Sequence, residues 1–234
     1  MRTQAEIRIL ELTRGGRRIS IGELADSLHI GLERLNQKLE VLSEKKAVSC
    51  NEGIVEMSTA QRIMLAEQLI HSGYDPQKVS RFLEWQEFEQ FTGETLERNG
   101  FRTVKHLVFK SRIGRREIDL LAWNDSFLLA IDCKHWLRGL SPARSRQVAS
   151  AQAERSQALA ERLDTLKKHG VCNPEKRSLM PMILCLGDPR ESIVNGVPIV
   201  AVSKLVSFLY GVSPIDEKLR RIPVKVEAGQ SLLM

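Results

Sequence analysis

The 234-residue sequence has no apolar run that approaches the roughly 18 residues a membrane-spanning helix needs. Its first ten residues, MRTQAEIRIL, carry scattered charges and lack the continuous apolar core of a secretory leader. Cysteine is also scarce, and the four cysteines form no CxxC pair and no metal-ligand spacing. We therefore expect a cytoplasmic protein with reduced thiols and no membrane partner.

The composition is that of an ordinary globular protein, with 42% apolar and 27% charged side chains. The net charge of +6 lies entirely in the second part of the chain: residues 1–80 hold 11 basic and 11 acidic side chains, whereas residues 81–234 hold 24 and 18. Acids are absent from residues 102–116, which carry six Lys or Arg, and from residues 133–153, which carry four. Such blocks attract phosphates and favour a nucleic-acid partner, although a solvated face would look the same.

Apolar spacing predicts three short helices in the first 45 residues, and the first of them ends at Gly15-Gly16. The apolar positions are, in order, Ile7, Leu10 and Leu12; Ile19, Ile21, Leu24 and Leu28; and Leu32, Leu35, Leu39 and Leu42. In AVSCNEGIVEMS, an Asn-Glu-Gly turn separates two β-prone runs, which predicts a hairpin.

Three helices and a hairpin resemble the winged-helix family over about residues 4–58. The resemblance implies that the third helix enters a DNA major groove, where Arg34 and Lys38 could meet phosphates. Three glutamates on the same helix would be repelled, so dimerisation or packing against a second domain is an alternative use. We assign residues 1–58 to this domain and residues 59–83 to a helical linker.

Residues 76–99 again have a helical pattern, with Asp75 as the cap, a bend near Leu83 and Gly100 as terminator. An apolar stripe along this helix contains one carboxylate. The stripe consists of Phe82, Trp85, Glu89, Thr92 and Leu96, whereas Glu84, Glu87, Glu94 and Glu97 are predicted to be solvated. Glu89 is therefore predicted to point inward, where an unpaired carboxylate is costly.

Residues 117–136, EIDLLAWNDSFLLAIDCKHW, read as two apolar strands around a turn. If Asp125 and Ser126 form a two-residue turn, Asp119 lies opposite Asp132 with Cβ atoms about 5 Å apart. Lys134 then projects from the same face, while Cys133 points to the other. Two carboxylates and one ammonium group are thus predicted to converge.

Like charges that face each other across strands are destabilising and require compensation. Lys134 could provide part of it in a structural ion cluster. Mg²⁺ or Mn²⁺, which prefer hard oxygen ligands, would neutralise the carboxylates more fully. With a lysine beside it, such a site suits the attack of a metal-activated water on a phosphodiester.

Glu89, Asp119 and the triplet Asp132-Cys133-Lys134 resemble the active-site signature of the PD-(D/E)xK nuclease superfamily. The segments FEQFTGETLERNGF, EIDLLA and AIDCK are most similar to archaeal Holliday-junction resolvases and Mrr-type restriction endonucleases. The resemblance implies that these two aspartates, Glu89 and Lys134 are catalytic, and that the three carboxylates hold Mg²⁺ or Mn²⁺. Ile118 stands where many members have proline, and the triplet begins with Asp instead of Glu.

The remaining pattern follows the order of elements in that superfamily: a helix over residues 141–170, strands over 179–187 and 197–203, and a helix over 204–211. The fold class predicted is α/β, with a restriction-endonuclease-like αβββαβ core over residues 84–234 and an N-terminal all-helical winged-helix domain. Gln147 and Gln152 could be a supplementary site residue, but we predict that they are solvated.

The function predicted is that of a metal-dependent DNA endonuclease. The alternative is a non-catalytic DNA-binding or regulatory protein on an inherited nuclease scaffold, and an RNA-processing nuclease also stays open. The residues that we expect to contact DNA are Arg34, Lys38, Arg112, Arg115, Arg116, Arg144 and Arg146. A homodimer and the structure of the substrate are left open.

Overall fold

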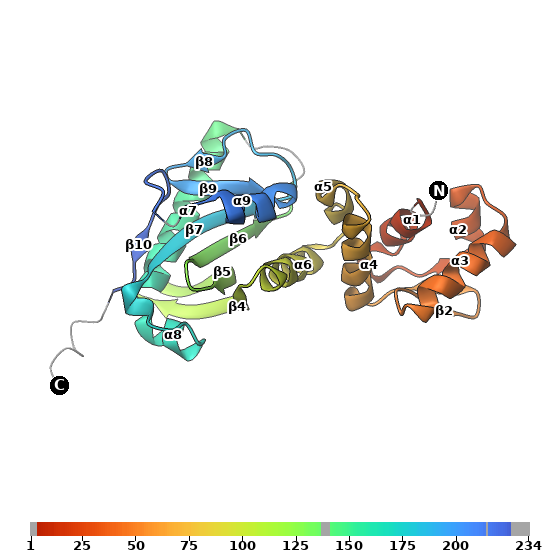
Figure 1. Ribbon diagram of the computed structural model, residues 1–234, viewed down its shortest axis with the longest axis horizontal. Coiled ribbons are helices and arrows are strands. Elements are labelled where there is room, and N and C mark those ends of the chain that lie inside the picture. Colours follow the sequence, from red (N-terminus) through yellow and green to blue (C-terminus); the bar gives the residue numbers. More distant parts are fainter. Residues whose placement is uncertain (1–3, 137–140, 214, 226–234) are drawn as a thin grey trace. The chain divides into compact units, whose positions relative to one another are not determined.

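The computed structural model describes residues 4–136, 141–213 and 215–225 (Figure 1). Arg138, one of the four basic residues counted in residues 133–153, lies outside this part of the chain. Two compact units are present, one up to Phe88 and the other from Glu89 onward. Among the described residues, no helix is both long enough and apolar enough to cross a membrane.

The first unit combines short helices with a small sheet. Its helices are α1 (Gln4–Leu12), α2 (Ile21–Leu28), α3 (Leu32–Glu44), α4 (Thr59–His71) and α5 (Pro76–Ser80), with a 3₁₀ turn at Arg14–Gly16. The strands β1 (Ile19–Ser20), β2 (Ser49–Asn51) and β3 (Ile54–Glu56) are ordered β1-β3-β2. The expected hairpin is β2–β3, but the expectation of an all-helical domain was wrong. Ile19, assigned to the second helix, is in β1 because it pairs with Val55 and is buried there.

Helix starts in this unit follow from local side-chain chemistry. The Ser20 hydroxyl accepts a hydrogen bond from the Glu23 backbone N–H, and the Glu23 carboxylate accepts one from the Ser20 N–H. Ser58 and Gln61 form the same reciprocal capping box at α4. Asp75 caps α5 as predicted, since its carboxylate accepts from the Gln77 N–H at 2.8 Å.

The helix predicted over residues 76–99 is divided into α5 and α6 (Trp85–Arg98), and the break between them includes Leu83, where a bend was predicted. A buried ion pair explains the break: Arg62 Nε donates to Glu87 Oε1 at 2.8 Å, and the Arg62 guanidinium also donates to the Phe82 carbonyl. The solvated position predicted for Glu87 was therefore wrong, because this carboxylate is buried against Arg62. The inward position predicted for Trp85 was also wrong, since its side chain is 40% exposed.

The second unit contains a mixed sheet, which confirms the α/β class. Its strands are β4 (Arg102–Ser111), β5 (Gly114–Trp123), β6 (Leu128–Lys134), β7 (Ser178–Cys185), β8 (Ile193–Val194), β9 (Val197–Ala201) and β10 (Ile222–Pro223). The order is β4-β5-β6-β7-β9-β8, with β10 beside β7. The first three strands are antiparallel, and β6, β7 and β9 are parallel.

Helices α6 and α7 cover opposite faces of this sheet. Leu121 packs in a core cluster with Leu159 of α7, whereas the neighbouring Leu120 approaches Gly93 of α6, and adjacent strand residues point to opposite faces. The helices of this unit after α6 are α7 (Pro142–Ala160), α8 (Leu163–Lys168) and α9 (Leu205–Gly211), with 3₁₀ turns at Pro174–Lys176 and Val202–Lys204.

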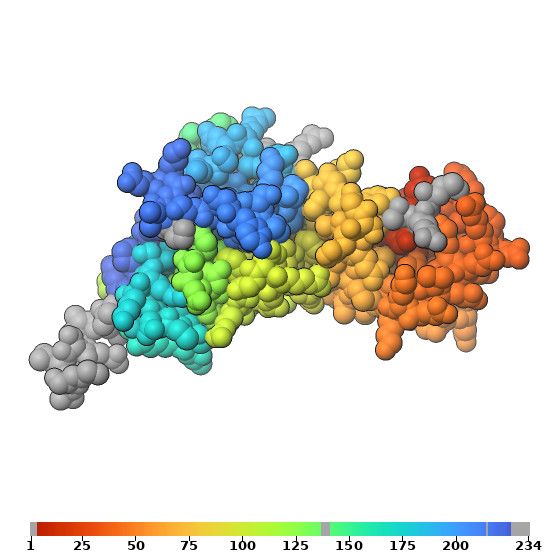
Figure 2. Space-filling view, in the orientation of Figure 1, coloured from red at the N-terminus to blue at the C-terminus, as the bar shows by residue number. Residues whose placement is uncertain are grey.

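The single helix predicted over residues 141–170 is divided into α7 and α8. Arg162 has φ −115° and ψ 66°, outside the helical region. The turn of the chain at Arg162 allows Leu163 and Leu166 to enter the core. The charged residues Asp164, Lys167 and Lys168 of α8 are exposed, and α8 lies at the surface in Figure 2.

Candidate active site

The turn between β5 and β6 sets the register of the site. The Asn124 N–H donates to the Phe127 carbonyl at 3.0 Å, and the Asn124 side chain accepts from the Ser126 and Phe127 N–H groups. The predicted two-residue turn is therefore confirmed. The ladder pairs Trp123 with Leu128 and continues to Leu120 opposite Ile131. The ladder ends there; one position further along, the same register would place Asp119 opposite Asp132.

Asp119 lies where the strand ladders are interrupted. Between β4 and β5, Lys105 pairs with Leu120 and Leu107 with Ile118, but His106 and Asp119 are not paired. His106 has φ 50°, a left-handed conformation that is uncommon for residues other than glycine. The freed Asp119 side chain accepts a hydrogen bond from the Cys133 N–H at 2.8 Å, which fixes one carboxylate oxygen beside β6.

The electrostatics around Asp119 reflect the facing carboxylates. Burial is the main cause that raises the pKa of Asp119 to about 6, and the negative charge of Asp132 raises it further. The bond from the Cys133 N–H and the charge of Lys134 act in the opposite direction. Ionising Asp119 in the folded protein therefore costs free energy, and a bound cation would relieve that cost.

Asp132 is 3% exposed and is held by two cations. Its Oδ1 accepts from Lys134 Nζ at 2.9 Å and lies 2.8 Å from Arg155 Nη2. Its Oδ2 is buried and has no hydrogen-bond partner within the described residues. Cys133 points to the other face, where burial raises the pKa of its thiol well above the ordinary value and leaves it an inert core residue.

Glu89 enters the site from the first half of α6 and is 2% exposed, as the stripe pattern predicted. Its Oε2 lies 3.4 Å from His106 Nε2, and the other ring nitrogen of His106 lies 3.1 Å from Glu117 Oε1. The charge of Glu89 also raises the pKa of Asp119. The structure therefore brings all four predicted catalytic residues into one region of the second unit.

Sequence reasoning missed Arg155 and His106 and misplaced Gln152. The solvated position predicted for Gln152 was wrong: it is fully buried, its Nε2 donates to the Ala130 carbonyl at 2.8 Å, and its Oε1 accepts from Arg155 Nε at 3.0 Å. Gln147 is exposed, as predicted. The signal available in the sequence was a polar pair three residues apart on the α7 face that also carries Ala149 and Ala153.

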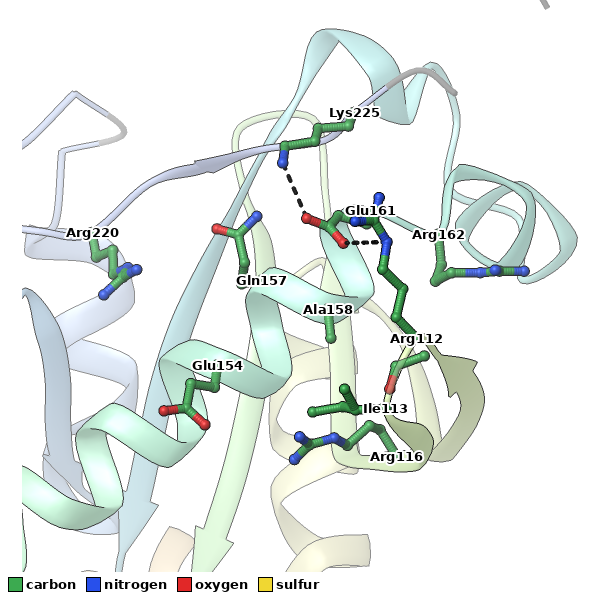
Figure 3. Close-up of a pocket in the computed structure, with 11 residues that line it drawn as sticks. Arg112, Ile113, Arg116, Glu154, Gln157, Ala158, Glu161, Arg162, Arg220 and Lys225 are labelled. Atoms are coloured by element: carbon green, nitrogen blue, oxygen red, sulfur yellow. Dashed lines mark hydrogen bonds and ion pairs between the residues drawn. The ribbon is translucent and has the colours of Figure 1, made fainter. Parts of the chain in front are cut away.

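The basic residues predicted to bind DNA are mainly on the surface. Arg34, Arg112, Arg115, Arg144 and Arg146 are exposed, and Lys38 and Arg116 are half-buried. Arg112 and Arg116 line a pocket of about 760 Å³ between the β4–β5 turn and α7 (Figure 3). The other charged residues that line it are Glu154, Glu161, Arg162, Arg220 and Lys225. Glu161 pairs with Lys225 at 3.0 Å and with Arg112 at 3.8 Å.

The fit of a metal can be judged from the carboxylates. Over residues 4–136, 141–213 and 215–225, no group of three or more His, Cys, Asp or Glu side chains could hold a metal ion. Mg²⁺, however, usually takes only one or two carboxylates and completes its shell with waters and substrate phosphates. Asp119 and Asp132 meet that requirement, and the unpartnered Oδ2 of Asp132 supplies a free acceptor. Glu89 would act directly or through water.

Part of the chain matches a known protein family. Residues 80–162 match the Restriction endonuclease family defined by the Mrr catalytic domain. This segment contains Glu89, Asp119, Asp132, Lys134 and Arg155 and is a restriction-endonuclease-like domain. An uncharacterized protein of Archaeoglobus fulgidus is 32% identical over 127 residues, which cover 54% of this chain and 90% of the archaeal protein. The chain belongs to the same family as that protein.

Two solved structures are more distantly similar. The crystal structure of AF1548, a protein of unknown function, is 20% identical over 53% of this chain, with a TM-score of 0.28. The crystal structure of protein VC1899 from Vibrio cholerae is 13% identical over 90% of this chain, with a TM-score of 0.40. The matches cover 54% and 50% of those two solved chains, about half of each.

Proposed function

We propose that the second unit is a DNA endonuclease that depends on Mg²⁺ or Mn²⁺ and hydrolyses phosphodiester bonds. The observation that carries this proposal is the convergence of two carboxylates inside the segment that matches restriction endonucleases: Asp119 accepts from the Cys133 N–H, and the neighbouring Asp132 accepts from Lys134. A bound divalent metal would lower the pKa of water and stabilise the charge that develops on the phosphate.

The residues of this chain have separate roles in the proposal. Asp119 and Asp132 hold the metal, and the Cys133 N–H keeps the Asp119 carboxylate oriented. Lys134, whose ammonium is bonded to Asp132, places a positive charge beside the reacting phosphate. Glu89 contributes a third carboxylate from α6, held near His106. If water attacks the phosphorus and the 3′ oxygen leaves, cleavage gives 5′-phosphate and 3′-hydroxyl ends.

We further propose that residues 1–58 act as a winged-helix DNA-binding domain, joined by the helical segment 59–83 to a nuclease domain over residues 84–234. Three helices with the sheet β1-β3-β2 support this proposal, and exposed Arg34 and half-buried Lys38 on α3 supply cations for phosphate contacts. In this proposal the protein is cytoplasmic, and both of its domains bind DNA.

A second candidate is a non-catalytic DNA-binding protein on a nuclease scaffold. The observation that favours it is the neutralisation of Asp132 by Lys134 and Arg155, which gives the carboxylate a structural role without any metal. An RNA-processing nuclease would use the same residues.

The test is a cleavage assay with purified protein and a panel of linear, nicked, branched and single-stranded DNA, together with RNA of matched sequence. We expect cleavage in Mg²⁺ or Mn²⁺, none in EDTA, and recovery when excess metal is restored. End analysis should give 5′-phosphates. Undiminished cleavage in EDTA would exclude the metal-dependent site, whereas binding without cleavage in any metal would favour the scaffold candidate.

A further inference from the structure

Arg155 is held at the site by a short chain of buried contacts. The Ala130 carbonyl of β6 accepts from Gln152 Nε2, Gln152 Oε1 accepts from Arg155 Nε, and Arg155 Nη2 lies 2.8 Å from Asp132 Oδ1. Gln152 is fully buried, and both ends of the chain of contacts lie on β6. The position of the guanidinium is therefore set by the buried Gln152 side chain as well as by its attraction to Asp132.

The charge of Arg155 cannot be switched off, because a guanidinium keeps its proton in proteins. A divalent cation at Asp132 would meet this fixed positive charge as well as that of Lys134. The repulsion should weaken metal binding unless an anion arrives with the metal. Gln152 accepts a hydrogen bond from Nε, and Nη2 lies 2.8 Å from Asp132 Oδ1 without forming a hydrogen bond, so neither residue occupies Nη1. The side chain is 24% exposed, which leaves it accessible to a ligand.

We propose that Arg155 is a phosphate-binding residue that couples metal binding to DNA binding. In the metal-free protein it neutralises Asp132, and when a metal takes that carboxylate the guanidinium binds an oxygen of the DNA phosphate. Arginine is suited to this exchange because its planar fork binds carboxylate and phosphate with the same geometry. This inference rests on the proposed function and identifies the phosphodiester as the ligand of Arg155.

Reciprocal coupling follows from this arrangement. If DNA relieves the repulsion between Arg155 and the metal, DNA must tighten metal binding by the same factor by which metal tightens DNA binding. Lys134 is less suited to this role, because its ammonium is a compact point charge on the same strand as Asp132. Arg155 instead reaches Asp132 from α7 and is anchored through Gln152.

The test compares the parent protein with Arg155→Gln. Mn²⁺ affinity is measured by calorimetry without DNA, and DNA affinity is measured in Ca²⁺ and in EDTA. We expect Arg155→Gln to bind Mn²⁺ about five- to tenfold more tightly than the parent. We also expect the increase in DNA affinity on addition of Ca²⁺ to be smaller than in the parent by a factor of at least about five. Both changes are in the usual range of coupling between two sites. Arg8→Gln, the control, removes the same charge from an arginine of the first unit that pairs with Glu11 and should change neither quantity.

The outcomes separate this inference from the proposed function. A parent that binds Mn²⁺ together with an Arg155→Gln variant of unchanged or weaker Mn²⁺ affinity would overturn the role of Arg155 and leave the metal site intact. A parent that binds no Mn²⁺ would overturn the proposed function, and the coupling with it. If Arg155→Gln does not fold, Arg155→Lys replaces it: Mn²⁺ affinity should stay near that of the parent while coupling falls, and full coupling in that variant would refute the role of the guanidinium fork.

Discussion

At the scale of single residues, Asp119 makes the stability of the metal-free protein depend on pH. Its ordinary pKa is 3.8, and in the folded protein it is raised to about 6, first by burial and then by the charge of Asp132. The folded state therefore binds more protons than the unfolded state between these values. By linkage, the contribution of Asp119 to stability falls as pH rises from about 4 to about 6, by at most about 1.4 kcal/mol per pH unit.

Asp119→Asn should remove this dependence. Asn keeps the acceptor for the Cys133 N–H but never becomes charged, so the variant should gain stability relative to the parent as pH rises, and the gain should level off above about pH 6. Melting temperatures of both proteins in EDTA, from pH 4 to pH 7, measure the difference, in which other titrating groups largely cancel. A difference in melting temperature that stays constant from pH 4 to pH 7 would mean that the pKa of Asp119 is not raised in the folded protein.

The register of β5 and β6 from Trp123–Leu128 to Leu120–Ile131 could be predicted from the sequence because a two-residue turn fixes every pair in an antiparallel ladder. Arg155, Gln152 and His106 could not be predicted in the same way. Arg155 and Gln152 come from α7, and the position of a helix over a sheet depends on packing of the whole unit. His106 meets Glu89 only because the β4–β5 ladder is interrupted at a residue in left-handed conformation.

At the scale of elements, the buried pair between Arg62 of α4 and Glu87 of α6 organises the first unit. Arg62 is 1% exposed and also donates to the Leu10 carbonyl and to the Thr13 hydroxyl, both at 2.7 Å. A single arginine therefore donates hydrogen bonds to acceptors from α1, from the residue after α1, from the segment before α6 and from α6 itself. Sequence periodicity alone placed Glu87 on a solvated face, because a partner 25 residues away leaves no periodic signal.

Arg62→Met should destabilise the protein by about 3–5 kcal/mol, because it leaves the Glu87 carboxylate buried without its partner. Chemical denaturation measures the loss. Arg8→Met is the matched control: Arg8 forms a 2.6 Å pair with Glu11 on the surface, and its loss should cost less than about 1 kcal/mol. Adding Glu87→Met to Arg62→Met should restore part of the stability. Equal losses of unfolding free energy in the Arg8→Met and Arg62→Met variants would show that the buried pair contributes no more to stability than the surface pair.

At the scale of the whole molecule, the excess of positive charge belongs to residues 81–234. Part of it lies at the β4–β5 turn, where Arg112 and Arg115 are exposed and Arg116 is half-buried.

The order and type of most helices and strands could be predicted from sequence periodicity. The strands β8 and β10 and the break between α7 and α8 could not be predicted, because a strand of two residues or a single non-helical residue leaves too little pattern in the sequence.

Replacing Arg112, Arg115 and Arg116 together with Ala should weaken DNA binding and flatten its salt dependence. Removing one cation that neutralises a DNA phosphate reduces the slope of log K against log salt by about 0.9. Binding titrations at several salt concentrations in Ca²⁺ measure the slope. The control replaces three exposed lysines elsewhere in the second unit, Lys167, Lys168 and Lys176. An equal change of slope in both triple variants would mean that net charge alone governs binding.

The central claim is that Asp119 and Asp132 form the metal-holding pair of a nuclease. The most direct measurement is the single-turnover cleavage rate of Asp119→Asn and Asp132→Asn in Mg²⁺, alongside DNA affinity in Ca²⁺. Asp164→Asn, the same chemical change at an exposed residue of α8, is the control. We predict that cleavage falls by orders of magnitude in both site variants, that DNA is still bound, and that the control cleaves like the parent. If both site variants cleave like the parent, the nuclease site has been wrongly placed.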